Sequence, residues 1–254
     1  MDLFSLKNKV AIVTGCSSLK GIGYAIAEGM AESGADIAGV ARSDLSEIKE
    51  SIESKTGQRF LKIQADLMEE DNLDRIIEET LAEYGRIDIL VNNAGMIKRN
   101  PVLEFPAEDW DSVMTVNLKS LFFLTQKVTK YFVENNIKGK VINTASMLSF
   151  QGGKFVPSYT ASKHGVAGIT KSFANELASK GVNVNAIAPG YIATENTAPL
   201  RKDKERSASI LSRIPAGRWG QNDDLKGAAI FLASKASDYM HGAIVPVDGG
   251  WLSS

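Results

Sequence analysis

The stretch KVAIVTGCSSLKGIGYAIA, residues 9–27, places a short apolar, β-branched run directly before a glycine-rich turn and a helical pattern. Gly15, Gly21 and Gly23 lie in that turn. Glycines at a strand-to-helix junction let the backbone approach a pyrophosphate, whose negative charge the helix N-terminus favours. The spacing departs from the usual G-x-G-x-x-G, because five residues separate Gly15 from Gly21. The position in the first strand–helix unit nevertheless favours nucleotide binding over a purely structural turn.

Similar apolar runs alternate with longer helical patterns along the whole chain. We expect strands at residues 9–14, 36–41, 60–65, 87–93, 140–145, 183–188 and 243–247. We expect helices at residues 22–33, 44–56, 70–84, 107–134, 158–180 and 223–234. The strand segments are apolar on both faces, which is typical of parallel strands covered by helices on either side. The alternation therefore predicts an α/β fold with a Rossmann-type, doubly wound parallel sheet of about seven strands.

The chain shows no repeat, low-complexity tract or linker, so a single domain over residues 1–254 is the simplest organisation. Residues 1–140 hold the nucleotide motif and form the expected cofactor half, and residues 141–254 form the expected catalytic and substrate half. Residues 190–215 are polar and follow a predicted strand. Open α/β sheets bind ligands beyond the carboxyl ends of their strands, so this segment is either a solvated helix or loop, or a mobile lid.

Composition narrows the class of protein further. Apolar residues make up 44% of the chain and charged residues 23%, and the net charge is −1, as in an ordinary globular protein. No run of like charges suggests a nucleic-acid or membrane-surface partner, and no apolar run approaches the roughly 20 residues that span a bilayer. The N-terminus lacks the pattern of a signal or transit peptide, and the single cysteine, Cys16, agrees with a reducing compartment. We therefore expect a cytoplasmic protein without nucleic-acid or membrane partners.

The second predicted strand ends in GVARSD, where an acid that hydrogen-bonds the adenosine ribose normally stands. Arg42 and Ser43 occupy that place. An arginine pairs with a 2′-phosphate, and Lys20 could add a second positive charge, so these residues favour NADP(H) unless both charges simply face solvent. Asp66, after the third predicted strand, is placed to contact adenine. NNAG, residues 92–95, suits a tight turn against a ribose, or a plain turn.

The stretch ASMLSFQGGKFVPSYTASK, residues 145–163, brings a hydroxyl, a phenol and an ammonium together. Tyr159 and Lys163 are four residues apart, so they share one face if they lie on a helix. A nearby ammonium favours the phenolate, and lowering the tyrosine pKa from near 10 to near 7 takes about 4 kcal/mol. Ser146, near the end of the preceding strand, could hydrogen-bond a substrate oxygen. Together, Ser146, Tyr159 and Lys163 predict proton transfer to or from a substrate alcohol or carbonyl oxygen.

Rival interpretations have less in the sequence to support them. His164 and His241 have no evident partners, no Cys/His cluster suggests a metal site, and no G-x-x-x-x-G-K-[ST] motif suggests an NTPase. A nucleotide-sensing binding protein would use the same fold. Such a protein need not keep a serine, a tyrosine and a lysine together, so an oxidoreductase is the favoured interpretation.

The motifs TG…GIG, NNAG, VNLKS, YTASK and APGYIAT, in this order over the whole chain, resemble those of the short-chain dehydrogenase/reductase family. The resemblance implies a seven-stranded Rossmann-type sheet and a homotetramer. It implies that Tyr159 is the general acid/base, and that Lys163 lowers the tyrosine pKa and holds the nicotinamide ribose. Ser146 would orient the substrate, and Asn117, in VNLKS, would support a water chain to the lysine.

The expected cofactor-binding residues include those named above and others that the resemblance implies. Among the latter are Ile192 and Thr194, which would contact the nicotinamide carboxamide. They are Gly15, Ser18, Lys20, Gly21, Ile22, Gly23, Arg42, Ser43, Asp66, Leu67, Asn93, Ala94, Gly95, Tyr159, Lys163, Pro189, Gly190, Ile192 and Thr194.

Residues 140–252, which include SILSRIPAGRWG and DGGWL, resemble more narrowly a group of bacterial dehydrogenases that act on keto-deoxy sugar acids in uronate breakdown. Gluconate 5-dehydrogenases share much of this pattern. A 3-oxoacyl carrier-protein reductase would share the catalytic set, but with an apolar lid and a basic docking patch. An enoyl reductase would share the longer glycine-rich loop, but with its tyrosine and lysine further apart. Relatives of the sugar-acid type are generally NAD-linked, so the resemblance favours NAD(H) where Lys20 and Arg42 favour NADP(H).

A sugar-acid substrate carries a carboxylate that a cation could anchor. Arg99 in MIKRNP, Lys154 between the serine and the tyrosine, and Arg218 in AGRWG lie in segments that could border the cleft. Each of them is a hypothesis, because an exposed cation is more often simply solvated.

Overall fold

The computed structural model describes residues 3–253, which form one α/β domain around a seven-stranded sheet. The strands lie in the order β3-β2-β1-β4-β5-β6-β7, and every pairing is parallel. They are β1 (Val10–Thr14), β2 (Asp36–Ala41), β3 (Phe60–Gln64), β4 (Ile89–Asn92), β5 (Lys140–Thr144), β6 (Asn183–Pro189) and β7 (Ile244–Val247). All seven expected strands are present, so the prediction of a doubly wound parallel sheet is confirmed.

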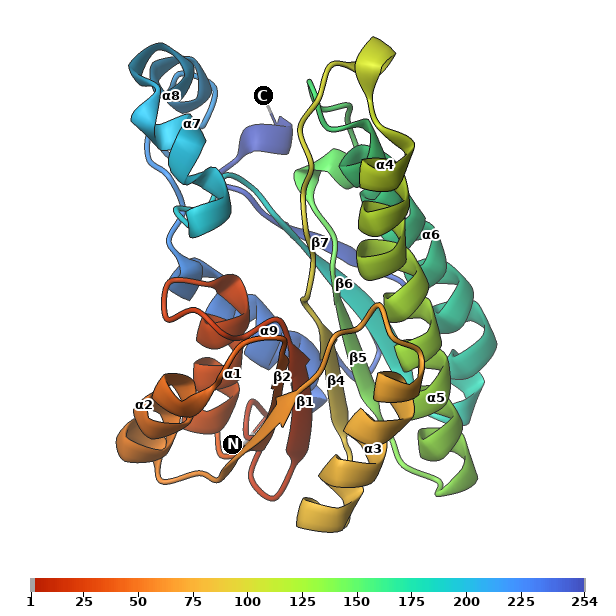
Figure 1. Ribbon diagram of the computed structural model, residues 1–254. Helices are drawn as coiled ribbons and strands as arrows, with labels where there is room; N and C mark the ends of the chain where they lie inside the picture. Colours follow the sequence, from red (N-terminus) through yellow and green to blue (C-terminus); the bar gives the residue numbers. More distant parts are fainter. Residues whose placement is uncertain (1–2, 254) are drawn as a thin grey trace.

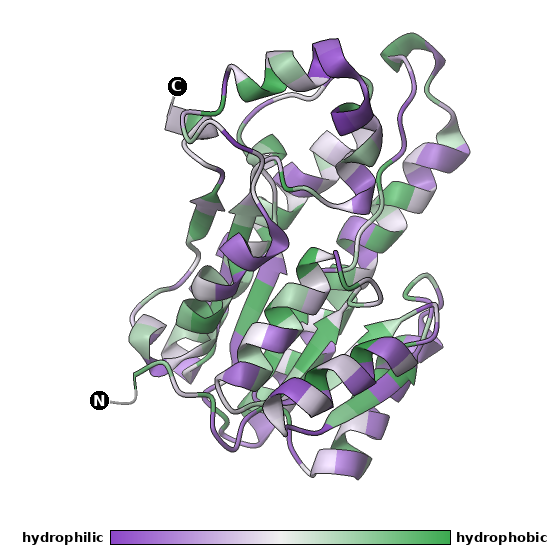
Figure 2. Cartoon of the chain, turned by 90° about the vertical axis from the view of Figure 1, so that its left-hand side faces the viewer, coloured by the Kyte–Doolittle hydropathy of each residue, from purple (hydrophilic) through white to green (hydrophobic). Residues whose placement is uncertain are grey.

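Helices cover both faces of the sheet (Figure 1). One face carries α1 (Ile22–Glu32), α2 (Ser46–Thr56) and α9 (Lys226–Ala233), and the other carries α3 (Asp71–Tyr84), α4 (Ala107–Met114), α5 (Ser120–Glu134) and α6 (Pro157–Leu177). Two large apolar clusters fill the space between sheet and helices, and Figure 2 shows the strands mostly hydrophobic, with hydrophilic residues on the outer helices. No helix within residues 3–253 is long and apolar enough to cross a membrane.

The direction of strand succession reverses beside β1, which has β2 on one side and β4 on the other. The carboxyl ends of parallel strands meet at one edge, and ligands of open α/β sheets bind in the crevice at such a reversal. Val13 of β1 is paired with Val91 of β4, and both residues lie just before the ends of their strands. The glycine-rich turn after β1 and the turn after β4 therefore flank this crevice.

The single helix expected at residues 107–134 is interrupted. A π-helical turn, Thr115–Lys119, separates α4 from α5 and contains the buried Asn117. A π turn accommodates one extra residue while both flanking helices keep their apolar spacing, so hydrophobic periodicity alone does not reveal it. Such turns are frequent at functional sites, which draws attention to Asn117.

The segment expected as a lid, residues 190–215, folds as a 3₁₀ turn (Glu195–Thr197) and two short helices, α7 (Ala198–Lys202) and α8 (Lys204–Leu211). Its outer face is polar, as the sequence indicates. Its inner face packs in a small apolar cluster in which Ile210 and Ile214 join Met147 and the C-terminal Trp251. The segment is therefore docked through apolar contacts, and its movement stays a prediction.

Candidate active site

A cavity of about 970 Å³ opens at the carboxyl edge of the sheet, between the glycine-rich turn, α6 and the lid segment. Most of the expected cofactor residues line it. They are Gly15, Ser18, Gly21, Ile22, Arg42, Ser43, Asp66, Leu67, Asn93, Ala94, Gly95, Tyr159, Lys163, Pro189, Gly190, Ile192 and Thr194. The remaining two, Lys20 and Gly23, are not among the described residues that line the cavity.

The glycine-rich turn is shaped by close backbone packing. Gly15 has a φ of +71°, and a Cβ there would lie 2.7 Å from the Ala94 Cα. A Cβ on Gly23 would lie 2.3 Å from the Gly15 carbonyl oxygen, so this glycine allows α1 to approach the turn. Asn93 Nδ2 donates to the carbonyls of Thr14 and Gly15, both at 3.0 Å. The resulting cradle and the start of α1 fit a pyrophosphate.

The far end of the cavity carries the residues expected to contact adenosine. The Arg42 carbonyl accepts a hydrogen bond from Gln64 Nε2 at 2.8 Å, while the Arg42 side chain makes no ion pair with any residue in 3–253. Lys20 is exposed, and only its backbone N–H contacts the loop, at Ser18 Oγ. Of the two charges expected to select a 2′-phosphate, only Arg42 therefore lines the cavity.

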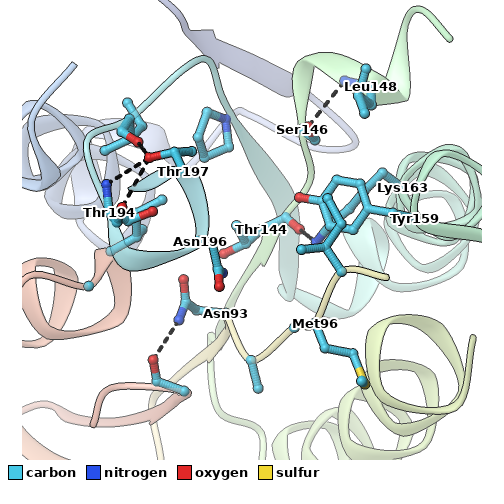
Figure 3. Close-up of a pocket in the computed structure, with 18 of the residues that line it drawn as sticks. Asn93, Met96, Thr144, Ser146, Leu148, Tyr159, Lys163, Thr194, Asn196 and Thr197 are labelled. Atoms are coloured by element: carbon cyan, nitrogen blue, oxygen red, sulfur yellow. Dashed lines mark hydrogen bonds between the residues drawn. The ribbon is translucent and has the colours of Figure 1, made fainter. Parts of the chain in front are cut away.

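The hydroxyl, phenol and ammonium predicted from sequence do come together (Figure 3). Helix α6 begins with Pro157 at its first turn, and its Tyr159 and Lys163 share a face, with Lys163 Nζ 5.5 Å from the centre of the Tyr159 ring. Lys163 Nζ donates to the Thr144 carbonyl at 2.6 Å. Ser146, just beyond β5, accepts a hydrogen bond from the Leu148 N–H at 3.1 Å. The Ser146 hydroxyl and the Lys163 ammonium are thus each held by a hydrogen bond to the backbone in the cavity that Tyr159 also lines.

Burial dominates the electrostatics of this set. It lowers the pKa of Lys163 to about 8. Burial also raises the pKa of Tyr159, against the opposing effects of the Ser146 hydroxyl and the Arg99 charge. The pKa of Tyr159 therefore lies above its ordinary value in this structure, and not below it as expected, because burial outweighs the groups that favour the phenolate.

Asn117 acts mainly on the backbone after β4. Its Oδ1 accepts from the Met96 N–H at 2.8 Å, and its Nδ2 donates to the Met96 carbonyl at 2.9 Å and to Ser162 Oγ at 3.2 Å. The π turn thus fixes the wall of the cavity beside α6. Its expected support of a water chain to the lysine stays a prediction.

The three candidate carboxylate anchors do not lie together. Arg99 and Lys154 line the cavity, and Arg99 Nη2 donates to the Asn196 carbonyl in the lid segment at 3.1 Å. Arg218 lies at a second, smaller cavity, where Asp224 accepts its guanidinium hydrogen bonds at 2.7 and 2.9 Å. Arg218 is therefore not among the described residues that line the main cavity, and its charge is paired in the turn before α9.

Two cations of the cavity were missed in the sequence. Arg206 in α8 and Arg213 after it both line the cavity from the lid. The polar run RKDKERS, which contains Arg206, was the available signal. It could not show which of its charges face inward, because that depends on how the apolar side of the lid docks.

A nucleotide cradle and a tyrosine–lysine pair in one crevice define a nicotinamide-dependent oxidoreductase that acts on CH–OH groups. The chain belongs to the short-chain dehydrogenase/reductase family, since a family model described as enoyl-(acyl carrier protein) reductase matches residues 15–252.

Three similar proteins narrow the comparison. The chain is 54% identical to the 2-dehydro-3-deoxy-D-gluconate 5-dehydrogenase of Escherichia coli K12, over 100% of this chain and 99% of the relative. A solved structure from Agrobacterium tumefaciens, provisionally described as a 2-deoxy-D-gluconate 3-dehydrogenase with bound NADP, is 52% identical, with a TM-score of 0.93 and full coverage of both chains. A Beutenbergia cavernae structure, provisionally described as an NAD(P)-dependent gluconate 5-dehydrogenase with NADP at low occupancy, is 46% identical, with a TM-score of 0.94, over 99% of this chain and 100% of that one.

Proposed function

We propose that this protein is a nicotinamide-dependent dehydrogenase that interconverts the C5 hydroxyl and the ketone of a keto-deoxy sugar acid, 2-dehydro-3-deoxy-D-gluconate. The observation that carries the proposal is the full-length identity of 54% to a dehydrogenase of this substrate. The cavity is consistent with it, because cations from the loop after β4 and from the lid line the same space as Tyr159.

The chemistry divides simply between cofactor and protein. A nicotinamide held between the glycine-rich turn and Thr194 would supply the hydride acceptor for the alcohol carbon, or the hydride donor for the ketone. As a phenolate, Tyr159 takes the proton of the substrate hydroxyl, and in the reverse direction the phenol donates it. Ser146 hydrogen-bonds the substrate oxygen and fixes it beside the phenol. The Lys163 ammonium and the positive nicotinamide ring would together favour the phenolate, against the burial that raises the pKa of Tyr159.

The nucleotide is proposed to be NADP(H). Arg42 and Ser43 line the adenosine end of the cavity, where an acid would otherwise hydrogen-bond the ribose. The Agrobacterium and Beutenbergia structures, both with NADP, support this choice. NAD(H) remains the alternative that sugar-acid dehydrogenases suggest. Arg42→Ala should lower kcat/KM for NADP⁺ by about tenfold and leave that for NAD⁺ nearly unchanged, because it removes a charge-assisted pair with the 2′-phosphate.

The setting of the enzyme is a further part of the proposal, and it is supported by the family resemblance of the sequence. We propose that it works in the cytoplasm in uronate breakdown, and that it assembles as a homotetramer. The two halves divide at about residue 140, and residues 190–215 close over bound substrate. Sedimentation velocity would test the tetramer, and a monomer or dimer at working concentration would contradict it.

One assay separates the substrate candidates. The purified protein is mixed with 2-dehydro-3-deoxy-D-gluconate or with D-gluconate, each with NAD⁺ or NADP⁺, and formation of reduced nicotinamide is followed. We expect turnover of the keto-deoxy acid with NADP⁺. Turnover of gluconate alone would favour the second candidate, a gluconate 5-dehydrogenase, to which the Beutenbergia relative points. Turnover of neither would contradict both substrates.

A further inference from the structure

Two serines three residues apart follow β5, and only the first of them belongs to the expected catalytic set. Ser146 precedes a 3₁₀ turn, Met147–Ser149, and Ser149 ends it. Ser146 lines the main cavity, whereas Ser149 is 8% exposed and is not among the described residues that line it. The chemistry proposed above leaves this second, buried hydroxyl without a task.

The Ser149 hydroxyl makes one hydrogen bond in each direction. It donates to the Lys163 carbonyl of α6 at 2.7 Å, and it accepts from the Ser146 backbone N–H at 3.3 Å. A serine hydroxyl has a single proton to donate, so the two bonds use its donor and its acceptor capacity together. Through one oxygen atom, the backbone of Ser146 is therefore joined to the backbone of the helix that carries Tyr159.

A second hydrogen bond closes a ring around Ser146. Lys163 Nζ donates to the Thr144 carbonyl at 2.6 Å, two residues before Ser146 (Figure 3). The chain after β5 is thus bonded to α6 on both sides of Ser146, by the lysine side chain before it and by the Ser149 hydroxyl after it. Ser146 lies within a closed loop of covalent and hydrogen bonds that also includes the backbone of Lys163.

The other two residues of the 3₁₀ turn belong to the apolar cluster beneath the lid. Met147 is buried there with Ile210, and Leu148 packs against the same cluster. Apolar contacts are non-directional, whereas a hydrogen bond restricts both a distance and an angle. Ser149 is therefore the residue of this turn that fixes its placement relative to α6.

The placement of Ser146 relative to α6 matters for proton transfer. The Ser146 hydroxyl has to reach the same substrate oxygen as Tyr159, and a hydrogen bond of this kind needs heavy atoms at about 2.6–3.2 Å. A displacement of about 1 Å within a catalytic set can lower the rate by about a hundredfold. The tie between the turn and α6 is therefore expected to affect the chemical step more than binding.

We propose that Ser149 is a positioning residue for the reaction, and that its hydroxyl holds Ser146 in register with Tyr159 and Lys163. Ser149 acts through these residues and does not touch substrate or cofactor, because it lies outside the cavity lining. The inference rests on the proposed function, since it needs Ser146 to hydrogen-bond the substrate oxygen. It extends the set of residues on which turnover depends to the buried side of the 3₁₀ turn.

The kinetic test compares three single variants and one double variant. Ser149→Ala removes the tie, and Ser146→Ala removes the hydroxyl that the tie positions. Ser158→Ala is the matched control, because Ser158 is buried on α6 beside Tyr159 and its hydroxyl has no hydrogen-bond partner within residues 3–253. The double variant Ser146→Ala/Ser149→Ala shows whether Ser149 acts through Ser146. Each protein is assayed with 2-dehydro-3-deoxy-D-gluconate and NADP⁺, and its Kd for NADPH is measured separately.

We expect Ser149→Ala to lower kcat at least tenfold, with KM and the Kd for NADPH within threefold of the wild type. Ser158→Ala should leave all three values unchanged. Once Ser146 is alanine, the further change from Ser149→Ala should lower kcat less than twofold, because no hydroxyl is left to position. An unchanged kcat, a loss in KM and Kd instead, or the same loss of kcat in both backgrounds would overturn the inference.

Amide hydrogen exchange gives a readout that needs no reaction. Ser149 accepts the hydrogen bond of the Ser146 N–H, so exchange at this amide should be at least tenfold faster in Ser149→Ala than in the wild type or Ser158→Ala. Mass spectrometry of overlapping peptides across residues 145–150 measures it. Unchanged exchange would overturn the inference. Faster exchange in Ser149→Ala, together with a wild type that does not turn over the acid, would uphold the tie to α6 and reject the proposed reaction instead.

Discussion

Replacement of Lys163 by methionine should change the stability of the protein in a pH-dependent way. The lysine is buried, and its pKa falls from 10.5 to about 8 on folding. Such a fall corresponds to about 3 kcal/mol of destabilisation of the native state wherever the lysine is charged in both states. Methionine removes this cost but leaves the Thr144 carbonyl without its 2.6 Å hydrogen bond, which costs about 1–3 kcal/mol. At pH 7 the variant should therefore be between about 0 and 2 kcal/mol more stable than the wild type.

The pH dependence is sharper than the absolute difference. Because the folded pKa of Lys163 is lower than the unfolded one, the unfolded chain binds more protons between these two values. The destabilisation is complete below pH 8 and disappears as the pH rises through 10.5. Between pH 7 and 9.5 the wild type should gain about 2 kcal/mol relative to Lys163→Met.

Urea unfolding of both proteins, at one protein concentration and at several pH values across this interval, measures the difference. Lys204→Met serves as the control, because Lys204 is exposed and its replacement should give a flat difference. A wild-type-minus-variant difference for Lys163 that stays constant from pH 7 to 9.5 would show that the buried lysine is not under the electrostatic stress described above. The variant should also have lost turnover throughout.

Three other outcomes follow from the site. Gly23→Ala puts a Cβ 2.3 Å from the Gly15 carbonyl oxygen, so it should lower the free energy of unfolding by about 2 kcal/mol and weaken NADPH binding. Gly227→Ala, which has open space around it, should be neutral or stabilising. Equal thermal denaturation curves for the two variants would contradict this. Glu195 accepts a hydrogen bond from Ser18 Oγ at 3.2 Å beside the glycine-rich turn. Glu195→Gln should therefore tighten NADPH binding about fivefold, because it removes about 1 kcal/mol of repulsion between the carboxylate and the nucleotide phosphates. A fluorescence titration that shows unchanged or weaker NADPH binding would refute this prediction. Since burial raises the pKa of Tyr159, kcat/KM for alcohol oxidation should rise with pH from 7 to 9, as the phenol ionises; a flat pH profile would count against Tyr159 as the base.

Most of the fold and of the catalytic residues could be predicted from short stretches of the sequence. The strand–helix alternation defines the sheet, and the glycines of the first turn define the cradle. The four-residue spacing of Tyr159 and Lys163 on α6 gives their shared face directly, since it depends only on the helix that contains them. These features need no knowledge of how distant segments pack.

The failures have a common physical origin in tertiary packing. Arg218 could be placed only once its pairing with Asp224 was known, and the inward position of Arg213 depends on Trp251, 38 residues later in the chain. The π turn at Asn117 preserves the apolar spacing on both sides and so leaves no pattern. The pKa of Tyr159 depends on burial, which no spacing of residues reports.

The most direct test of the central claim is the Tyr159→Phe variant. It removes one hydroxyl and keeps the ring, so the cavity and the nucleotide cradle should be unchanged. We predict that turnover of 2-dehydro-3-deoxy-D-gluconate falls by at least a thousandfold while the Kd for NADPH stays within twofold of the wild type. Turnover within tenfold of the wild type, with NADPH still bound, would contradict the assignment of proton transfer to this phenol.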